Sequence, residues 1–150
     1  EYSLTTKNRP MFSRPESRKN RWSLNDNYLR FWFRFIFPNQ SLIEMGKYDL
    51  LQEVIDRGYE QYSGLVLEKY FRTKIAEEER ITGIGSYWDN KGENEIDVIA
   101  INDLDKTAIV AEVKRNPKKI DMNTLQSKVH SVKELAKYKV ELQGLSLENM

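Results

Sequence analysis

Cysteine is absent from the 150-residue chain, and histidine occurs once, at His130. Without a thiol the protein forms neither a disulfide nor a thiolate metal site. His130 falls in a helical pattern, where we expect a surface residue, so a Cys/His zinc site is excluded as well.

Long apolar runs are also missing. No stretch approaches the ~20 residues that span a bilayer, and no segment resembles a secretory signal. We expect a cytoplasmic protein without a membrane partner. The chain begins at Glu1 rather than at methionine, which favours a fragment of a longer polypeptide.

Positive and negative charges nearly balance, and the net charge is only +1. The charges are unevenly spread, however. Residues 1–37 hold eight Lys or Arg against three acids, and residues 114–139 hold eight against two. Two basic zones favour a polyanion such as nucleic acid as a partner, although solvated faces of proteins often show the same pattern.

The first half of the chain reads as an arm followed by helices. Residues 1–24, with Pro10 and Pro15, predict a loosely held hairpin or arm. Asp26 is a helix N-cap candidate, and six of the ten residues in 28–37 are aromatic. This aromatic helix, with Trp32 among its anchors, is either core or a face that docks on a neighbouring domain or a second copy.

The remaining elements predict an α/β (α+β) fold. Two helices are expected at 41–56 and 58–75, separated at Gly58. From residue 80 the period changes, and three strands, a helix and a final strand follow. The expected ranges are 80–88, 95–102 and 107–114 for an antiparallel meander, 121–137 for the helix and 138–147 for the last strand.

Charged residues interrupt two otherwise apolar strands. Glu112 and Lys114 are two apart, so they point to the same face of the sheet. In the strand before, we expect Ile96 and Val98 on one face, with Asp97, Ile99 and Ile101 on the other. Because strands of a meander are neighbours, Asp97 can approach Glu112.

Two carboxylates beside a lysine suit phosphodiester hydrolysis. Mg²⁺ prefers hard oxygen ligands, and the lysine can stabilise developing negative charge. For a lone pair such as Glu112 and Lys114, a structural ion pair at a sheet edge is the alternative. The additional Asp97 favours a functional site.

The residues 96–98 and 111–114 resemble the PD-(D/E)XK pattern of restriction-endonuclease-like nucleases. The resemblance implies that core fold and a catalytic set of Asp97, Glu112 and Lys114. It also implies an acid on the preceding helix, matched by Glu68, and a polar residue on the following helix, matched by Gln126. The implied ligands of Mg²⁺ or Mn²⁺ are Asp97, Glu112 and Glu68. Ile96 stands where the pattern has proline.

A wider resemblance covers residues 26–35, 83–88, 95–97 and 144–147. These segments are similar to the C-terminal domain of unknown function of archaeal-type P-loop ATPases of prokaryotes. The resemblance implies an ATPase and a winged-helix domain before this chain, with residues 1–24 as the remnant of the wing. No Gly-x-x-x-x-Gly-Lys-Ser/Thr occurs here, so an ATPase would lie outside the chain.

Two hypotheses of function follow. The first is a metal-dependent nuclease, or a nuclease-derived DNA-binding domain, at the C-terminus of an ATPase. The alternative is a catalytically silent interaction domain that forms a homo-oligomer or contacts the ATPase through the aromatic helix. The expected division is an arm at 1–24, an aromatic-rich helical segment at 25–57 and a nuclease-like domain at 58–150.

Overall fold

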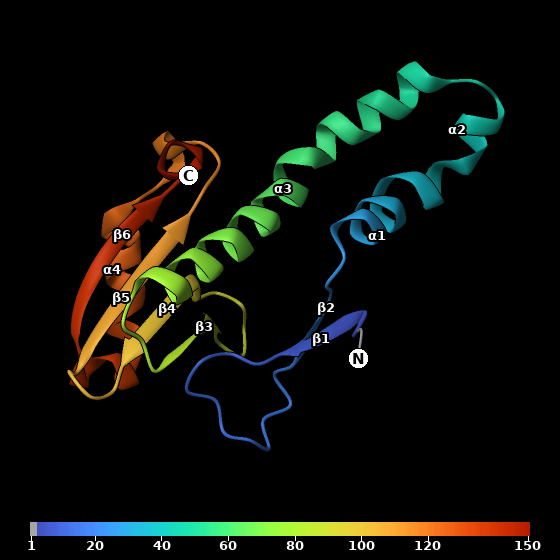
Figure 1. Ribbon diagram of the computed structural model, residues 1–150. Coiled ribbons are helices and arrows are strands. Elements are labelled where there is room, and N and C mark those ends of the chain that lie inside the picture. Colours follow the sequence, from blue (N-terminus) through green and yellow to red (C-terminus); the bar gives the residue numbers. More distant parts are fainter. Residues whose placement is uncertain (1–2) are drawn as a thin grey trace. The chain divides into compact units, whose positions relative to one another are not determined.

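The computed structural model describes residues 3–150 (Figure 1). The described chain forms two compact units. The first consists of residues 3–8 together with Arg21–Val66, and the second of Arg9–Asn20 together with Leu67–Met150. Within the described part, no helix has the length and apolar character of a membrane span.

The first unit begins with a two-stranded hairpin, as the sequence predicted for the arm. Strand β1 (Thr5–Asn8) pairs antiparallel with β2 (Arg21–Leu24). The Asn8 side chain donates to the Ser23 hydroxyl across the pair, at 2.8 Å. The first two residues of the predicted arm lie outside the described residues.

The aromatic segment is helical but is not one regular α-helix. Helix α1 (Asn27–Phe31) is capped by Asp26, whose carboxylate accepts from the backbone N–H of Leu29 at 2.9 Å. A π-helical turn η1 (Trp32–Ile36) and a 3₁₀ turn η2 (Phe37–Asn39) follow. A π turn changes the angular spacing of side chains, so successive aromatic residues do not follow one stripe.

Phe35 is the most buried ring of this segment. Phe35 is 2% exposed, whereas Trp32 is only half-buried and stacks on Tyr28, with ring centroids 6.2 Å apart. The Phe35 ring packs against Phe31 and Tyr62, with centroids 5.1 and 5.7 Å away. A Cβ atom at Gly58 would lie 2.6 Å from Phe35 Cε1, so Gly58 provides the room for this ring.

A single long helix replaces the two predicted at 41–56 and 58–75. After the short α2 (Gln40–Glu44), helix α3 runs without interruption from Tyr48 to Glu78. The chain turns at Gly46, which has a φ of +67°. Gly58 does not adopt the positive φ of a helix-ending glycine, so the helix continues through it, and its small size serves packing against Phe35. The division between the two units falls within α3.

The second unit contains a four-stranded mixed sheet in the order β3-β4-β5-β6. Strands β3 (Gly83–Trp88), β4 (Glu95–Asn102) and β5 (Thr107–Val113) form the predicted antiparallel meander. Strand β6 (Lys139–Leu145) runs parallel to β5. The α/β class predicted from the sequence is confirmed as a mixed α/β fold.

The crossover from β5 to β6 contains η3 (Pro117–Lys119), α4 (Met122–Ser131) and η4 (Lys133–Lys137), and η5 (Leu147–Asn149) follows β6. The predicted helix to residue 137 thus ends early. Val132 leaves the helical conformation, with φ −93° and ψ 96°. The break lets both Val132 and Leu135 reach the core, where each is 1% exposed.

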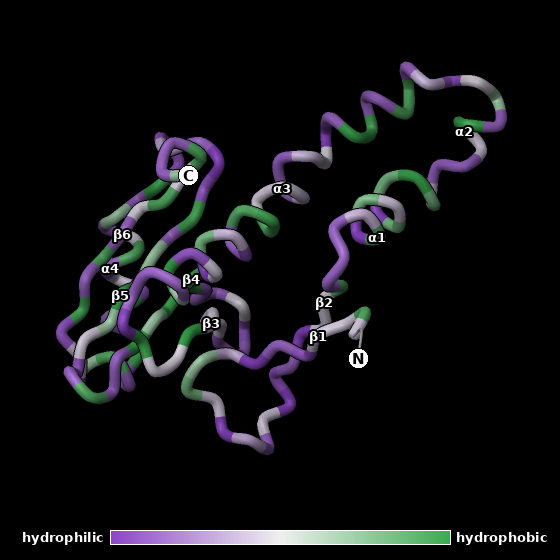
Figure 2. The backbone as a smooth tube through the Cα atoms, in the orientation of Figure 1, coloured by the Kyte–Doolittle hydropathy of each residue, from purple (hydrophilic) through white to green (hydrophobic). Residues whose placement is uncertain are grey.

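Both faces of the sheet are covered, and Figure 2 shows the hydrophobic residues along β4 and β5. On the α4 face, Ile96, Ile99 and Val110 pack with Leu125. On the α3 face, the core cluster contains the following residues: Leu67, Phe71, Ile75, Val98, Ala100, Ala111 and Val113. Strands buried on both sides read as continuous apolar runs, so the charged residues within them are costly exceptions.

A β-bulge changes the face of the sheet on which the side chains of β4 lie, compared with the prediction. Gly85 pairs with Ile99 and Tyr87 with Ile96, so Asp97 and Val98 stand opposite the single residue Ser86. The extra residue reverses the alternation, because a bulge shifts the pleat by one. Ile96 therefore shares the α4 face with Ile99, and the prediction that it shares a face with Val98 was wrong.

Candidate functional site

Asp97 lies in this bulge, at the point where β4 and β5 stop pairing regularly. The regular pairing begins with Val98 opposite Ala111, and Asp97 is the residue just before Val98 on β4. The Asp97 carboxylate accepts a hydrogen bond from the backbone N–H of Val113 at 2.8 Å. The side chain thus replaces a ladder hydrogen bond, which fixes one carboxylate oxygen at the end of β5.

Lys114 forms ion pairs with both acids of the predicted site. Its Nζ lies 3.4 Å from Asp97 Oδ2 and 3.2 Å from Glu112 Oε1. Burial lowers the pKa of Lys114, but the combined attraction of Asp97 and Glu112 outweighs it, so the pKa is raised. The ammonium group is therefore charged at neutral pH. Asp97, Glu112 and Lys114 are brought together as the sequence predicted.

Glu112 is the most buried charged residue of the group, at 7% exposure. Its Oε1 atom is also 3.7 Å from Lys128 Nζ, on α4. Its Oε2 atom is buried and, within the described residues, has no hydrogen-bond partner. A buried carboxylate oxygen without a partner is costly to the fold, and in native proteins such an atom calls for an explanation.

Glu68 reaches the same region from α3. Burial, and then the neighbouring charge of Asp97, raise the pKa of Glu68 to about 7, although Arg72 and Lys114 act in the opposite direction. Arg72 stands one helical turn after Glu68 and donates to the Ser86 hydroxyl at 2.5 Å. The charge of Asp97 thus acts on the acid of the preceding helix.

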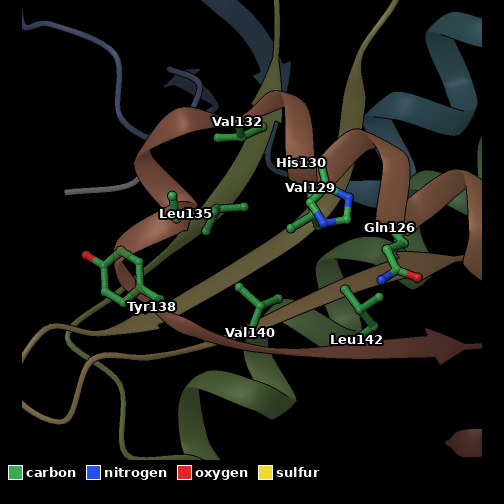
Figure 3. A pocket seen from close by; sticks show the side chains of 9 residues that line it. Gln126, Val129, His130, Val132, Leu135, Tyr138, Val140 and Leu142 are labelled. Atoms are coloured by element: carbon green, nitrogen blue, oxygen red, sulfur yellow. The ribbon is translucent and has the colours of Figure 1, made fainter.

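Gln126 is not brought to the carboxylates. It is exposed and lines a cavity of about 340 Å³ between α4, η4 and β6, together with His130, Val140 and Leu142 (Figure 3). The structure brings Lys128 to Glu112 instead. Lys128 lies three residues after the buried Leu125 and so shares its face of α4, whereas Gln126 is turned by about 100° from Leu125. That spacing is the signal by which the sequence could have identified Lys128.

The donor set fits a hard divalent cation such as Mg²⁺ or Mn²⁺. Glu68, Asp97 and Glu112 offer only oxygen atoms, and Glu112 Oε2 is a buried oxygen that has no partner among residues 3–150. Asp97 and Glu112 face the ammonium group of Lys114, and Glu112 also faces that of Lys128. Among residues 3–150, no three acidic or histidine side chains are already placed around one common point suited to an ion.

The fold and this cluster define a mixed α/β protein with an acidic and basic site at the end of its central strands. The chain belongs to the DUF234 family, described as archaeal and bacterial proteins of unknown function, whose model matches residues 32–128. The matched segment includes Glu68, Asp97, Glu112, Lys114 and Lys128.

One curated relative is likewise an uncharacterized protein. The chain is 39% identical over 121 residues to an uncharacterized protein of Methanocaldococcus jannaschii, and the match covers 76% of this chain. It covers 27% of the relative, so the chain spans about a quarter of that protein's length. No solved structure matches the chain.

Proposed function

We propose that the second unit is a divalent-metal-dependent phosphodiesterase of the PD-(D/E)XK type, acting on DNA. The observation that carries this proposal is the convergence of Asp97, Glu112 and Lys114 at the end of β4 and β5. Lys114 Nζ lies within 3.4 Å of both carboxylates. Glu68 on α3 supports the proposal as a third acid, because its pKa is raised, first by burial and then by the charge of Asp97.

Each residue has a distinct role in the proposed reaction. Asp97, Glu112 and Glu68 would hold Mg²⁺ or Mn²⁺, with Glu112 Oε2 as one of the available oxygens. When bound, the cation activates water and neutralises phosphate charge. Lys114 places its ammonium group beside the reacting phosphate and stabilises the negative charge that develops there. Lys128 keeps a second cation at Glu112 Oε1 and so holds that carboxylate in place.

The attachment of this site to an ATPase and a winged-helix domain belongs to the proposal as well. It is supported by the resemblance of the segments around Asp26, Gly83 and Gly144 to the C-terminal domain of such ATPases. In that setting the ATPase would control when the phosphodiesterase meets DNA.

The experiment is cleavage of labelled DNA with Mg²⁺ or Mn²⁺, comparing wild type with Asp97→Asn. Loss of one stabilising group at such a site costs about 10²–10³-fold in rate. Glu141→Gln, an exposed acid on β6, is the matched control and should cleave at the wild-type rate. Calorimetric titration with Mn²⁺ should show binding that Glu112→Gln abolishes. Equal rates for wild type and Asp97→Asn would refute the proposal.

A second candidate function rests on a separate observation in the first unit. Tyr28, Phe33 and Phe37 are each more than half exposed along the aromatic segment. Contiguous exposed aromatic side chains mark protein interaction surfaces. We propose that this segment contacts a second copy or a neighbouring domain. Sedimentation velocity of Phe33→Ser with Phe37→Ser tests it, since a homo-oligomer formed through this surface would dissociate.

A further inference from the structure

The loop between β1 and β2, residues 9–20, concentrates positive charge. It carries Arg9, Arg14, Arg18 and Lys19 against the single acid Glu16, although the whole chain has a net charge of only +1. We infer that this basic loop binds the sugar-phosphate backbone of nucleic acid beside the carboxylate site. The inference deepens the proposed function and rests on it only for the identity of the ligand.

The basic loop is fixed to the sheet of the second unit. The backbone N–H of Met11 donates to the carbonyl of Ser86 on β3 at 2.8 Å. A Cβ atom at Gly85 would lie 2.9 Å from Met11 Cγ and Sδ, so the glycine lets the Met11 side chain lie directly on the strand. Binding through an anchored loop loses less conformational entropy than binding through a free one.

Phe12 strengthens this anchorage at a conformational cost. Its φ is +64°, a region that bulky residues rarely adopt. Its half-buried ring packs against the core cluster on the α4 face. Such strained positions persist where the surrounding structure fixes them, and they concentrate at functional sites.

The basic loop and the carboxylate site share one attachment residue. Ser86 accepts from Met11 of the loop through its carbonyl, and from Arg72 of α3 through its hydroxyl. Arg72 is in turn close enough to Glu68 to lower the pKa of that acid. The loop and α3 therefore contact the same residue of β3.

The side chains of the basic loop favour nucleic acid over an anionic membrane. Arg14 and Arg18 are exposed, while Arg9 donates to the carbonyl of Pro15 at 3.0 Å and helps to shape the loop. Met11 and Phe12 pack inward, so the loop presents no large apolar side chain. Membrane-surface segments combine basic residues with apolar ones that enter the acyl boundary, and here the second component is absent from the described loop.

The test measures binding without cleavage. Fluorescence anisotropy with a labelled 20-nucleotide DNA strand and its duplex, in EDTA, compares wild type with Arg14→Ala/Arg18→Ala. We expect at least ~10-fold weaker binding at low salt, and a decrease of about 2 in the slope of log K against log salt on duplex, because two phosphate contacts are lost. The exposed pair Lys47→Ala/Arg57→Ala removes equal charge outside the loop and outside both basic zones, and should bind as wild type.

A second variant tests the anchorage without changing charge. Gly85→Ala places a methyl group against Met11 and should also weaken binding, with an unchanged circular dichroism spectrum. Wild-type affinity of Arg14→Ala/Arg18→Ala, or an equal loss in the control pair, overturns the inference. So does tighter binding to phosphatidylserine vesicles than to DNA.

The binding and cleavage results separate the inference from the proposed function. Loop-dependent binding by a protein that does not cleave DNA in Mn²⁺ supports the inference and refutes the phosphodiesterase. Cleavage by the wild type, together with binding that is unchanged in Arg14→Ala/Arg18→Ala, supports the phosphodiesterase and refutes the inference.

Discussion

The two units keep their apolar side chains in different places. In the first unit, Phe35 and Leu51 are the buried hydrophobic residues within the described chain, although this unit holds most of the aromatic residues. In the second unit, aliphatic side chains of β4 and β5 fill two core clusters, one on each face of the sheet. The aromatic side chains of the first unit therefore lie largely at its surface, while aliphatic strands form the core of the second.

The difference between the two units can be tested by replacing one phenylalanine in each unit. Phe71, 2% exposed on α3, belongs to the second unit, whereas Phe33 of the aromatic segment is 51% exposed. Phe71→Ala should lower the free energy of unfolding by about 3–5 kcal/mol. Phe33→Ala should change it by less than about 0.5 kcal/mol. Urea denaturation measures both, and equal losses would show that the aromatic segment is also a stabilising core.

A second prediction concerns the charges that the second unit buries. Lys114 is 37% exposed, and after Lys114→Met Glu112 keeps Lys128 while Asp97 keeps the Val113 N–H. The single change should therefore cost only about 1 kcal/mol, since exposed ion pairs are screened. Removing both lysines leaves Glu112 buried and unpaired, and should cost about 3–5 kcal/mol.

A double-mutant cycle measures this coupling. If Lys114→Met and Lys128→Met each destabilise the protein and their effects simply add, the two lysines do not share Glu112. The same cycle separates stability from chemistry, because Lys114→Met should abolish DNA cleavage while the protein remains folded.

The third prediction uses the pKa of Glu68, which is raised to about 7 from 4.5. Between those values the folded state binds more protons than the unfolded state, so stability falls as the pH rises from about 4.5 through 7. Glu68→Gln removes this dependence. At pH 8 in EDTA, the variant should be more stable than wild type by about 1–2 kcal/mol, a figure reduced for partial exposure.

Thermal unfolding at pH 5 and pH 8 provides the check. A difference between variant and wild type that is the same at both pH values would mean that Glu68 titrates normally. The exposed acid Glu53, also on α3, gives a matched Glu53→Gln control.

The smallest effects are expected from two glycines of α3 in the first unit. At Gly64 a Cβ atom meets nothing within 4 Å, whereas at Gly58 it lies 2.6 Å from Phe35. Gly64→Ala should stabilise the protein by about 0.5–1 kcal/mol through helix propensity. Gly58→Ala should destabilise it by about 1 kcal/mol or more, because Phe35 must move. Opposite signs in urea denaturation would confirm Phe35 as the anchor of this unit.

Much of the second unit could be predicted from the sequence. Alternation within 107–114 placed Glu112 and Lys114 on one face, and the meander brought Asp97 beside them. The bulge at Asp97 and Val98 could not be predicted, because it depends on how β4 pairs with β3. Lys128 was not identified from the sequence. Gln126 was chosen from a resemblance to other proteins, whereas the spacing of Lys128 from Leu125 would have placed Lys128 on the buried face of the helix.

The first unit was harder to predict for a related reason. Propensity marks Gly58 as a helix break, but the role of that residue is the space it leaves for Phe35 across the unit. Similarly, composition shows that residues 28–37 are aromatic but not which ring is buried. The π turn at Trp32–Ile36 determines that choice.

The parallel pairing of β6 with β5 has a consequence for the order of folding. The connections within β3-β4-β5 are short turns, whereas β6 joins only after the long crossover through α4. Contacts between segments far apart in the chain form late, because closing the longer loop costs more entropy. Lys114 donates its backbone N–H to Leu145 at the end of β6. We therefore expect φ-values near zero for Leu142→Ala and higher ones for Val98→Ala, so that Lys114 reaches its final position only in the last step of folding.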